Sequence, residues 1–86
     1  MYPYVVEFLG TLLLISVISF VGNPFAIAGA LLTAILLGGS VSGGHFNPAV
    51  SLWAWLAGKI TTNKLGMYVG AQSAAGVVVW LLGKMV

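Results

Sequence analysis

Apolar residues fill most of the chain in three long runs, at residues 4–22, 25–41 and 65–83. A helix over the first or third run, about nineteen residues each, is roughly 28 Å long, enough to cross the hydrocarbon core of a bilayer. The second run has about seventeen residues, near the lower limit for a span. Gly22-Asn23-Pro24 is a compact turn signal between the first two runs. The pattern therefore predicts three transmembrane helices.

Residues 42–58 break this pattern. A polar stretch at 42–46 is followed by Asn47-Pro48 and a helical run to Gly58. This run of about eleven residues reaches only about 16 Å, roughly half a bilayer. Lys59 and Lys64 follow at once and place its end at a membrane surface. The short helix must therefore enter and leave by one face, and the polar stretch lies inside the membrane. Non-helical backbone is tolerated there only when it is buried in protein or lines a wet cavity.

Composition agrees with this interpretation, because 60% of the residues are hydrophobic and only 5% are charged. We expect an all-α, multi-pass integral membrane protein in contact with lipid. Residues 1–86 would form a single unit of three transmembrane helices plus one re-entrant half-helix. The first run lacks a basic flank and a small-residue cleavage site, so we interpret it as a retained span and not as a signal peptide.

The polar inventory is too small for several other functions. The chain has no cysteine, one histidine, one acidic residue and a net charge of +2. Disulfides and thiolate metal sites are excluded, and a catalytic triad or other metal site is not expected. Three lysines are too few for a nucleic-acid patch. We expect neither an enzyme nor a cofactor.

Asn47 is well placed to start a helix inside the membrane. Its side-chain oxygen can accept a backbone N–H of the first turn, and Pro48 at the first helical position needs no acceptor. The NH₂ group of Asn47 then remains free as a donor. The helix N-terminus adds a partial positive charge near the bilayer centre. Together these features would attract the oxygen of a neutral solute and repel cations. The alternative is an ordinary helix start.

Three stretches resemble one family, the aquaporins and aquaglyceroporins (the major intrinsic proteins). S-G-G-H-F-N-P-A-V-S at 42–51 resembles their signature loop, S-G-x-H-x-N-P-A-V. V-E-F-L-G-T at 6–11 and Y-V-G-A-Q-S-A-A-G at 68–76 resemble their first and third helices. The resemblance covers the whole chain, but only the first of the two inverted repeats in the family's fold. It implies a passive channel for water and/or small uncharged solutes.

The resemblance also implies roles for individual residues. The carbonyl groups of the loop would form a ladder of acceptors along the pore, and the Asn-Pro-Ala motif would lie at its centre, against the motif of a second repeat. Residues of the second span at helical spacing would form the apolar wall opposite. The ladder would comprise Gly43, Gly44, His45 and Phe46; the centre Asn47, Pro48 and Ala49; and the wall Ile27, Leu31, Ala34 and Ile35.

Glu7 would lie behind the loop and hold its backbone in place. A lone carboxylate in a span costs about 2.5–3.5 kcal/mol, so a partner is expected. We favour a structural role in which Glu7 accepts hydrogen bonds from loop N–H groups or His45, over an interfacial position or a proton relay. His45 would brace the loop, and Gln72 would bond to the loop from the third span.

One repeat cannot enclose a pore, so a partner is expected to cover the carbonyl ladder. The family's geometry requires an inverted partner, which suggests an antiparallel homodimer, and the family's tetramers of pores imply four such pairs. Lys59 and Lys64 on one face against Lys84 on the other give a weak bias that permits insertion in both orientations. The alternatives are a heteromer whose partner half carries an arginine, and a non-conducting structural membrane protein.

The mouth of the pore departs from the family pattern. The family has an arginine after the second repeat's Asn-Pro-Ala motif, whereas here Val50 follows the motif and the chain contains no arginine. In a homodimer each mouth would receive Ile27 from one subunit and Ile35, Gly44 and Val50 from the other. The constriction would then be apolar.

Overall fold

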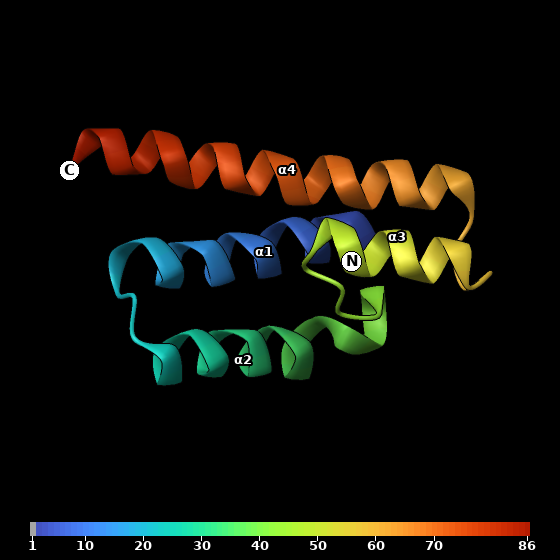
Figure 1. The fold of residues 1–86 in the computed structure, drawn as a ribbon, viewed down its shortest axis with the longest axis horizontal. Coiled ribbons are helices and arrows are strands. Elements are labelled where there is room, and N and C mark those ends of the chain that lie inside the picture. The colour runs from blue at the N-terminus through green and yellow to red at the C-terminus, as the bar shows by residue number, and fades with distance from the viewer. Residues whose placement is uncertain (1) are drawn as a thin grey trace.

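The computed structural model describes residues 2–86, which form four helices (Figure 1). These are α1 (Pro3–Phe20), α2 (Pro24–Ser42), α3 (Pro48–Leu56) and α4 (Thr62–Met85). Helices α1, α2 and α4 are long and apolar enough to cross a membrane, and α3, with nine residues, is not. The predicted all-α membrane fold, with three spans and one shorter helix, is confirmed, and the protein is an integral membrane protein.

Local capping groups decide where the helices begin and end. The side chain of Asn23 accepts the N–H groups of Phe25 and Ala26, at 2.8 and 3.2 Å, and starts α2. Helix α2 ends at Gly43, which adopts the left-handed conformation with φ +90°. Helix α4 begins earlier than its hydrophobic run, because the Thr61 hydroxyl accepts the N–H of Lys64 at 3.1 Å. Hydrophobicity alone therefore places the spans but not their ends.

Helix α1 is the centre of the bundle. Helix α2 packs on one side of it, α4 packs on another, and α3 packs on α4. Figure 1 shows that α1 and α4 run in the same direction along the long axis and that α2 runs in the opposite direction. Helix α3 begins near the middle of the bundle and runs toward the end where α2 stops and α4 starts. The C-terminus lies at the opposite end.

Small residues allow α2 to approach α1 closely. A Cβ atom added at Gly38 would overlap Val6 of α1, and one added at Gly10 would overlap the ring of Phe46. Val6, Ala34 and Phe46 form the buried hydrophobic cluster at this contact. The prediction that Ala34 belongs to an apolar pore wall is therefore wrong. The side chain of Ala34 packs against Val6 of α1. It is on a different face of α2 from Ile35, because consecutive residues are about 100° apart around a helix.

Candidate functional site

The carboxylate of Glu7 is the centre of a buried polar cluster behind the loop between α2 and α3. Its side chain is 0% exposed. Its Oε2 accepts the Ser42 hydroxyl at 2.7 Å and the His45 backbone N–H at 3.0 Å. Its Oε1 accepts the Phe46 backbone N–H at 2.7 Å and the Gln72 side-chain N–H at 2.8 Å. One carboxylate thus joins α1, the loop and α4.

Four donors fill the acceptor sites of the two carboxylate oxygens of Glu7. The orientation of the Gln72 amide follows from the same chemistry, since a flipped amide would direct its carbonyl at the carboxylate. The complete burial of Glu7 argues against the interfacial alternative. Its filled acceptors favour the bracing role over a proton relay.

A second layer of hydrogen bonds connects the cluster to α3 and α4. Ser51 of α3, which is 0% exposed, bonds through its hydroxyl to Nδ1 of His45 at 2.8 Å and accepts the Gln72 N–H at 2.9 Å. The Tyr68 hydroxyl donates to the Ser42 carbonyl at 2.6 Å. Gln72 therefore bonds to Glu7 and Ser51, and not to the loop backbone itself.

Sequence reasoning missed three members of this cluster: Ser42, Ser51 and Tyr68. A signal for two of them exists in the helical spacing. Ser51 is one turn after Asn47 on α3, and Tyr68 is one turn before Gln72 on α4, so each shares a face with a residue already selected. Without a view of the packing, nothing distinguishes them from other polar residues in the spans.

The backbone N–H groups of the loop are hydrogen-bonded within the chain, whereas its carbonyl groups are not. The N–H of Gly44 donates to the Ser42 hydroxyl at 3.1 Å, and the next two N–H groups donate to Glu7. The carbonyl oxygens of residues 43–46 accept no hydrogen bond within the described residues 2–86. The loop thus uses its donors for structure and leaves its acceptors free.

An unusual backbone path makes this arrangement possible. Gly43, Gly44 and Phe46 all have positive φ, of 90°, 66° and 53°. Glycine tolerates this region, but a bulky residue there is strained and persists only when its surroundings hold it. The Phe46 N–H is bonded to Glu7, and its ring is 2% exposed beside Gly10. Phe46 therefore anchors the loop with its side chain.

Asn47 caps α3 from the exposed side of the loop. Its Oδ1 accepts the N–H of Ala49 at 2.8 Å, and Pro48 occupies the first helical position. Asn47, Pro48, Ala49 and Val50 are all exposed. The amide nitrogen of Asn47 has no hydrogen-bond partner within residues 2–86, so it is available to a solute at the positive end of α3.

The other three α2 residues predicted for the pore wall share one face of the helix, because they are four residues apart: Ile27, Leu31 and Ile35. Ile35 lies against the loop, since a methyl group added at Gly44 would be 3.4 Å from its Cγ1. Leu31 and Ile35 are 36% and 43% exposed, so packing within this chain leaves much of this face uncovered. Ile27, one turn before Leu31 on α2, is half-buried.

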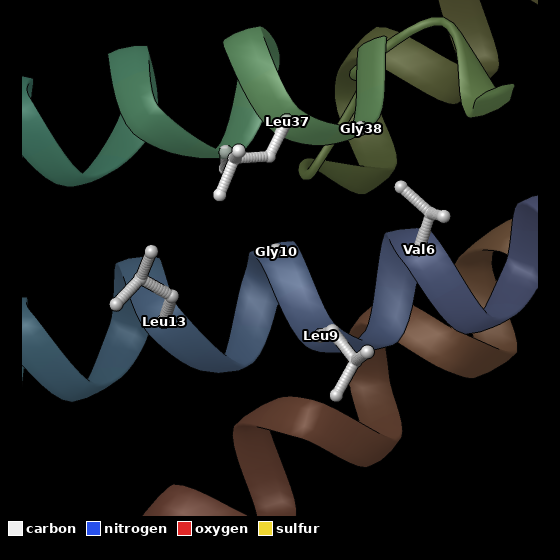
Figure 2. A pocket seen from close by; sticks show the side chains of 7 residues that line it. Val6, Leu9, Gly10, Leu13, Leu37 and Gly38 are labelled. Atoms are coloured by element: carbon white, nitrogen blue, oxygen red, sulfur yellow. The ribbon is translucent and has the colours of Figure 1, made fainter. Parts of the chain in front are cut away.

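A separate groove of about 310 Å³ runs between α1 and α2 (Figure 2). Figure 2 shows Val6 and Leu13 directed from α1 toward α2, with Leu37 on the opposite side of the groove. Its lining is apolar: Val6, Leu9, Gly10, Leu13, Ala34, Leu37 and Gly38. Leu37 lies about 200° around α2 from Ile35, so this groove is distinct from the face that Ile35 shares with the loop. It offers no polar side chain to a solute.

Comparisons with known proteins identify the family of the chain. The family model described as "Major intrinsic protein" matches residues 16–86, which include the loop, α3 and α4. The chain therefore belongs to the major intrinsic protein family. Rat Aquaporin-8 is 40% identical over 95 aligned residues, which cover 98% of this chain and 36% of that protein.

Two other relatives match shorter parts of the chain. Aquaporin Z of Photorhabdus laumondii is 38% identical over 61 residues, covering 71% of this chain and 26% of its own length. Human Aquaporin-9 is 56% identical over 43 residues, covering 50% of this chain and 15% of its own length. The chain thus spans little more than a third, at most, of these relatives. No solved structure gives a significant match.

Proposed function

We propose that the protein is a passive channel for water and/or small uncharged solutes, of which this chain supplies one half of the pore. The observation that carries the proposal is that the carbonyl oxygens of four consecutive residues, 43–46, accept no hydrogen bond within residues 2–86, and that the side-chain NH₂ of the next residue, Asn47, is also free. Such groups can replace the hydrogen bonds that a neutral solute loses when it leaves bulk water. Membership of the major intrinsic proteins supports the same function.

The proposed half-pore discriminates against cations by its electrostatics. The N-terminus of α3 carries a partial positive charge at the point where the chain turns inside the membrane. Glu7, the one acidic side chain, lies behind the loop with all four acceptor sites filled. A cation at Asn47 would therefore lose its hydration and meet a repulsive field, whereas a water molecule would meet a donor and several acceptors.

A second half-pore, inverted with respect to this one, would complete the channel. Free carbonyl groups that faced lipid would cost several kcal/mol each, so the open side of the loop needs a cover. Because α3 begins near mid-bundle, an inverted half-repeat would bring a second Asn-Pro-Ala motif against Pro48 and Ala49. The simplest such partner is a second copy of this chain, with four such pairs in the assembly. Each mouth would then be formed by Ile27 of one copy and Ile35, Gly44 and Val50 of the other.

Osmotic shrinkage of reconstituted vesicles tests the channel function. After a sucrose step, vesicles with the protein should shrink several-fold faster than empty vesicles, without a proton leak. Val50→Trp should slow the shrinkage by narrowing the mouth, whereas Val77→Trp, at an exposed position of α4, should not. Equal shrinkage of empty vesicles and vesicles with folded protein would rule the function out.

Disulfide crosslinking tests the inverted arrangement, because the chain has no native cysteine. Ala49→Cys should form a disulfide-linked dimer, since the two motifs meet at the centre of an inverted pair. Leu82→Cys is the matched control, and its two copies would lie at opposite membrane faces. Crosslinking of Leu82→Cys without Ala49→Cys would exclude the inverted pair. Water transport without either crosslink would indicate a different partner half.

A further inference from the structure

We propose that a cavity at the surface end of α3 binds the headgroup of an anionic phospholipid. The cavity, of about 530 Å³, lies between the end of α2, the loop, α3 and the start of α4. Its lining differs in kind from the apolar groove of Figure 2, because it includes hydroxyl, imidazole, indole and ammonium groups. The polar and aromatic members are Ser40, Ser42, His45, Trp53, Lys59 and Lys64.

The cavity carries two positive charges. The ammonium group of Lys59 lies 5.7 Å from the centroid of the Trp53 ring, and that of Lys64 lies 5.6 Å from the centroid of the Tyr68 ring. Glu7, the single acidic side chain, is fully buried, and neither lysine forms a salt bridge with it within residues 2–86. Two lysines at one cleft raise its positive potential and favour an anion.

The position of the cavity points to a lipid and not to a free anion. Lys59 and Lys64 flank the segment that joins α3 to α4 at a membrane surface, and Trp53 is of the residue type enriched at that level. Val41, which lines the cavity, is 41% exposed, and Leu56, one turn after the lining residue Trp53 on α3, is 70% exposed, so both offer apolar surface to acyl chains. A basic pocket between transmembrane helices at such a level is suited to an anionic headgroup.

The cavity also contacts the proposed pore, since Gly43, His45 and Val50 contribute to its lining. A headgroup bound there would lie beside the pore mouth. Binding itself requires only the charges and the shape of the cavity, so it can be tested without a transport assay. A failure of lipid binding would leave the proposed channel function intact, and the reverse also holds.

Lipid binding can be measured with purified protein in uncharged detergent, titrated with phosphatidylglycerol or phosphatidylcholine and followed by native mass spectrometry. The wild-type protein should prefer phosphatidylglycerol. Lys59→Gln and Lys64→Gln should each weaken that binding about fivefold, the effect of one basic residue near an anionic headgroup. Lys84→Gln is the matched control, because Lys84 also lies over an indole, at 4.6 Å from the Trp80 centroid, but at the other end of the bundle. It should change binding by less than about twofold.

Ser40→Trp distinguishes the contribution of the cavity's shape to lipid binding from that of its charge, because the indole fills the cavity while both lysines remain. It should abolish the preference for phosphatidylglycerol while circular dichroism stays that of the wild type. An equal loss in Lys84→Gln, or unchanged binding in Ser40→Trp, would show that net charge alone attracts the lipid and would overturn the site. Competition by inorganic phosphate at the lipid's own concentration would show that the ligand is a free anion, which would overturn the lipid assignment.

Discussion

The buried cluster around Glu7 and the carbonyl groups of the loop between α2 and α3 contrast sharply in how their polar groups are used. Behind the loop, three backbone N–H groups, two serines, Gln72 and Tyr68 are joined around Glu7 in a buried cluster. By contrast, the four carbonyl groups of residues 43–46 and the side-chain NH₂ of Asn47 have no partner within residues 2–86. The N–H donors of the loop are therefore bonded within the chain, whereas its carbonyl acceptors are available.

This difference shows how a chain can keep irregular backbone inside a membrane and still leave polar groups for a solute. An unpaired backbone group in hydrocarbon costs several kcal/mol, so a loop with both sets of groups free would not persist. Here the donors are satisfied within the chain, and the remaining acceptors all have the same polarity. In the proposed channel these acceptors would bond to the O–H groups of a solute such as water, and the positive end of α3 would oppose cations.

Removal of Glu7 should have the largest effect, because it leaves several buried donors unpaired at once. Glu7→Leu should lower the free energy of unfolding by about 3 kcal/mol or more, measured by denaturation in mixed micelles. Thr11→Val is the matched control, one turn along α1, where the buried hydroxyl has no partner. It should change stability by less than about 1 kcal/mol. Similar losses in the two variants would contradict the central role of Glu7.

The anchor of the loop can be tested at Gly10, where a methyl group would overlap the Phe46 ring. Gly10→Ala should destabilise the protein by about 1–3 kcal/mol, the usual cost of overpacking, and should also slow water transport by displacing the loop. Gly70→Ala, with open space around its Cβ, should instead stabilise α4 by about 0.5–1 kcal/mol. The prediction fails if both substitutions shift stability in the same direction.

Substitutions of Asn47 distinguish two roles of its side chain: the oxygen that caps α3, measured by stability, and the free NH₂ group, measured by water permeability. Asn47→Ser keeps a capping oxygen, so stability should remain within about 0.5 kcal/mol of the wild type. It removes the NH₂ donor, and water permeability should fall about two- to tenfold, the equivalent of one net hydrogen bond. Asn47→Ala should show the same loss of permeability and, in addition, a loss of about 1 kcal/mol in stability. Normal permeability in Asn47→Ser would show that the amide does not contact the solute.

The smallest effect is expected at the edge of the cluster. Tyr68→Phe removes one hydrogen bond, from the tyrosine hydroxyl to the Ser42 carbonyl, and should cost about 1 kcal/mol in the free energy of unfolding. Tyr4→Phe is the control, because its hydroxyl makes no hydrogen bond within residues 2–86 and its loss should be close to neutral. A larger loss in Tyr4→Phe than in Tyr68→Phe would show that the carbonyl bond contributes little.

Much of the candidate site could be predicted because its signals are local. The Asn47-Pro48 start of α3 follows from capping chemistry within one turn, and the two glycines before it permit two of the three positive φ angles of the loop; the third, at Phe46, depends on tertiary packing. A bracing role for Glu7 follows from the cost of a lone carboxylate in a span. The selection of pore residues also depended on the family resemblance, and their contact with a solute stays a prediction.

The sequence by itself determined the membrane class, the three spans and the half-length helix, because hydrophobic run length and helix caps act within a few residues. Only the tertiary structure decided which polar side chains meet behind the loop. Glu7 bonds to Ser42 and Gln72, which are 35 and 65 residues away in the sequence, and Ala34 faces α1 because two helices pack closely at Gly38. Such contacts depend on the rotation of each helix about its axis, which packing fixes and hydropathy along the chain does not.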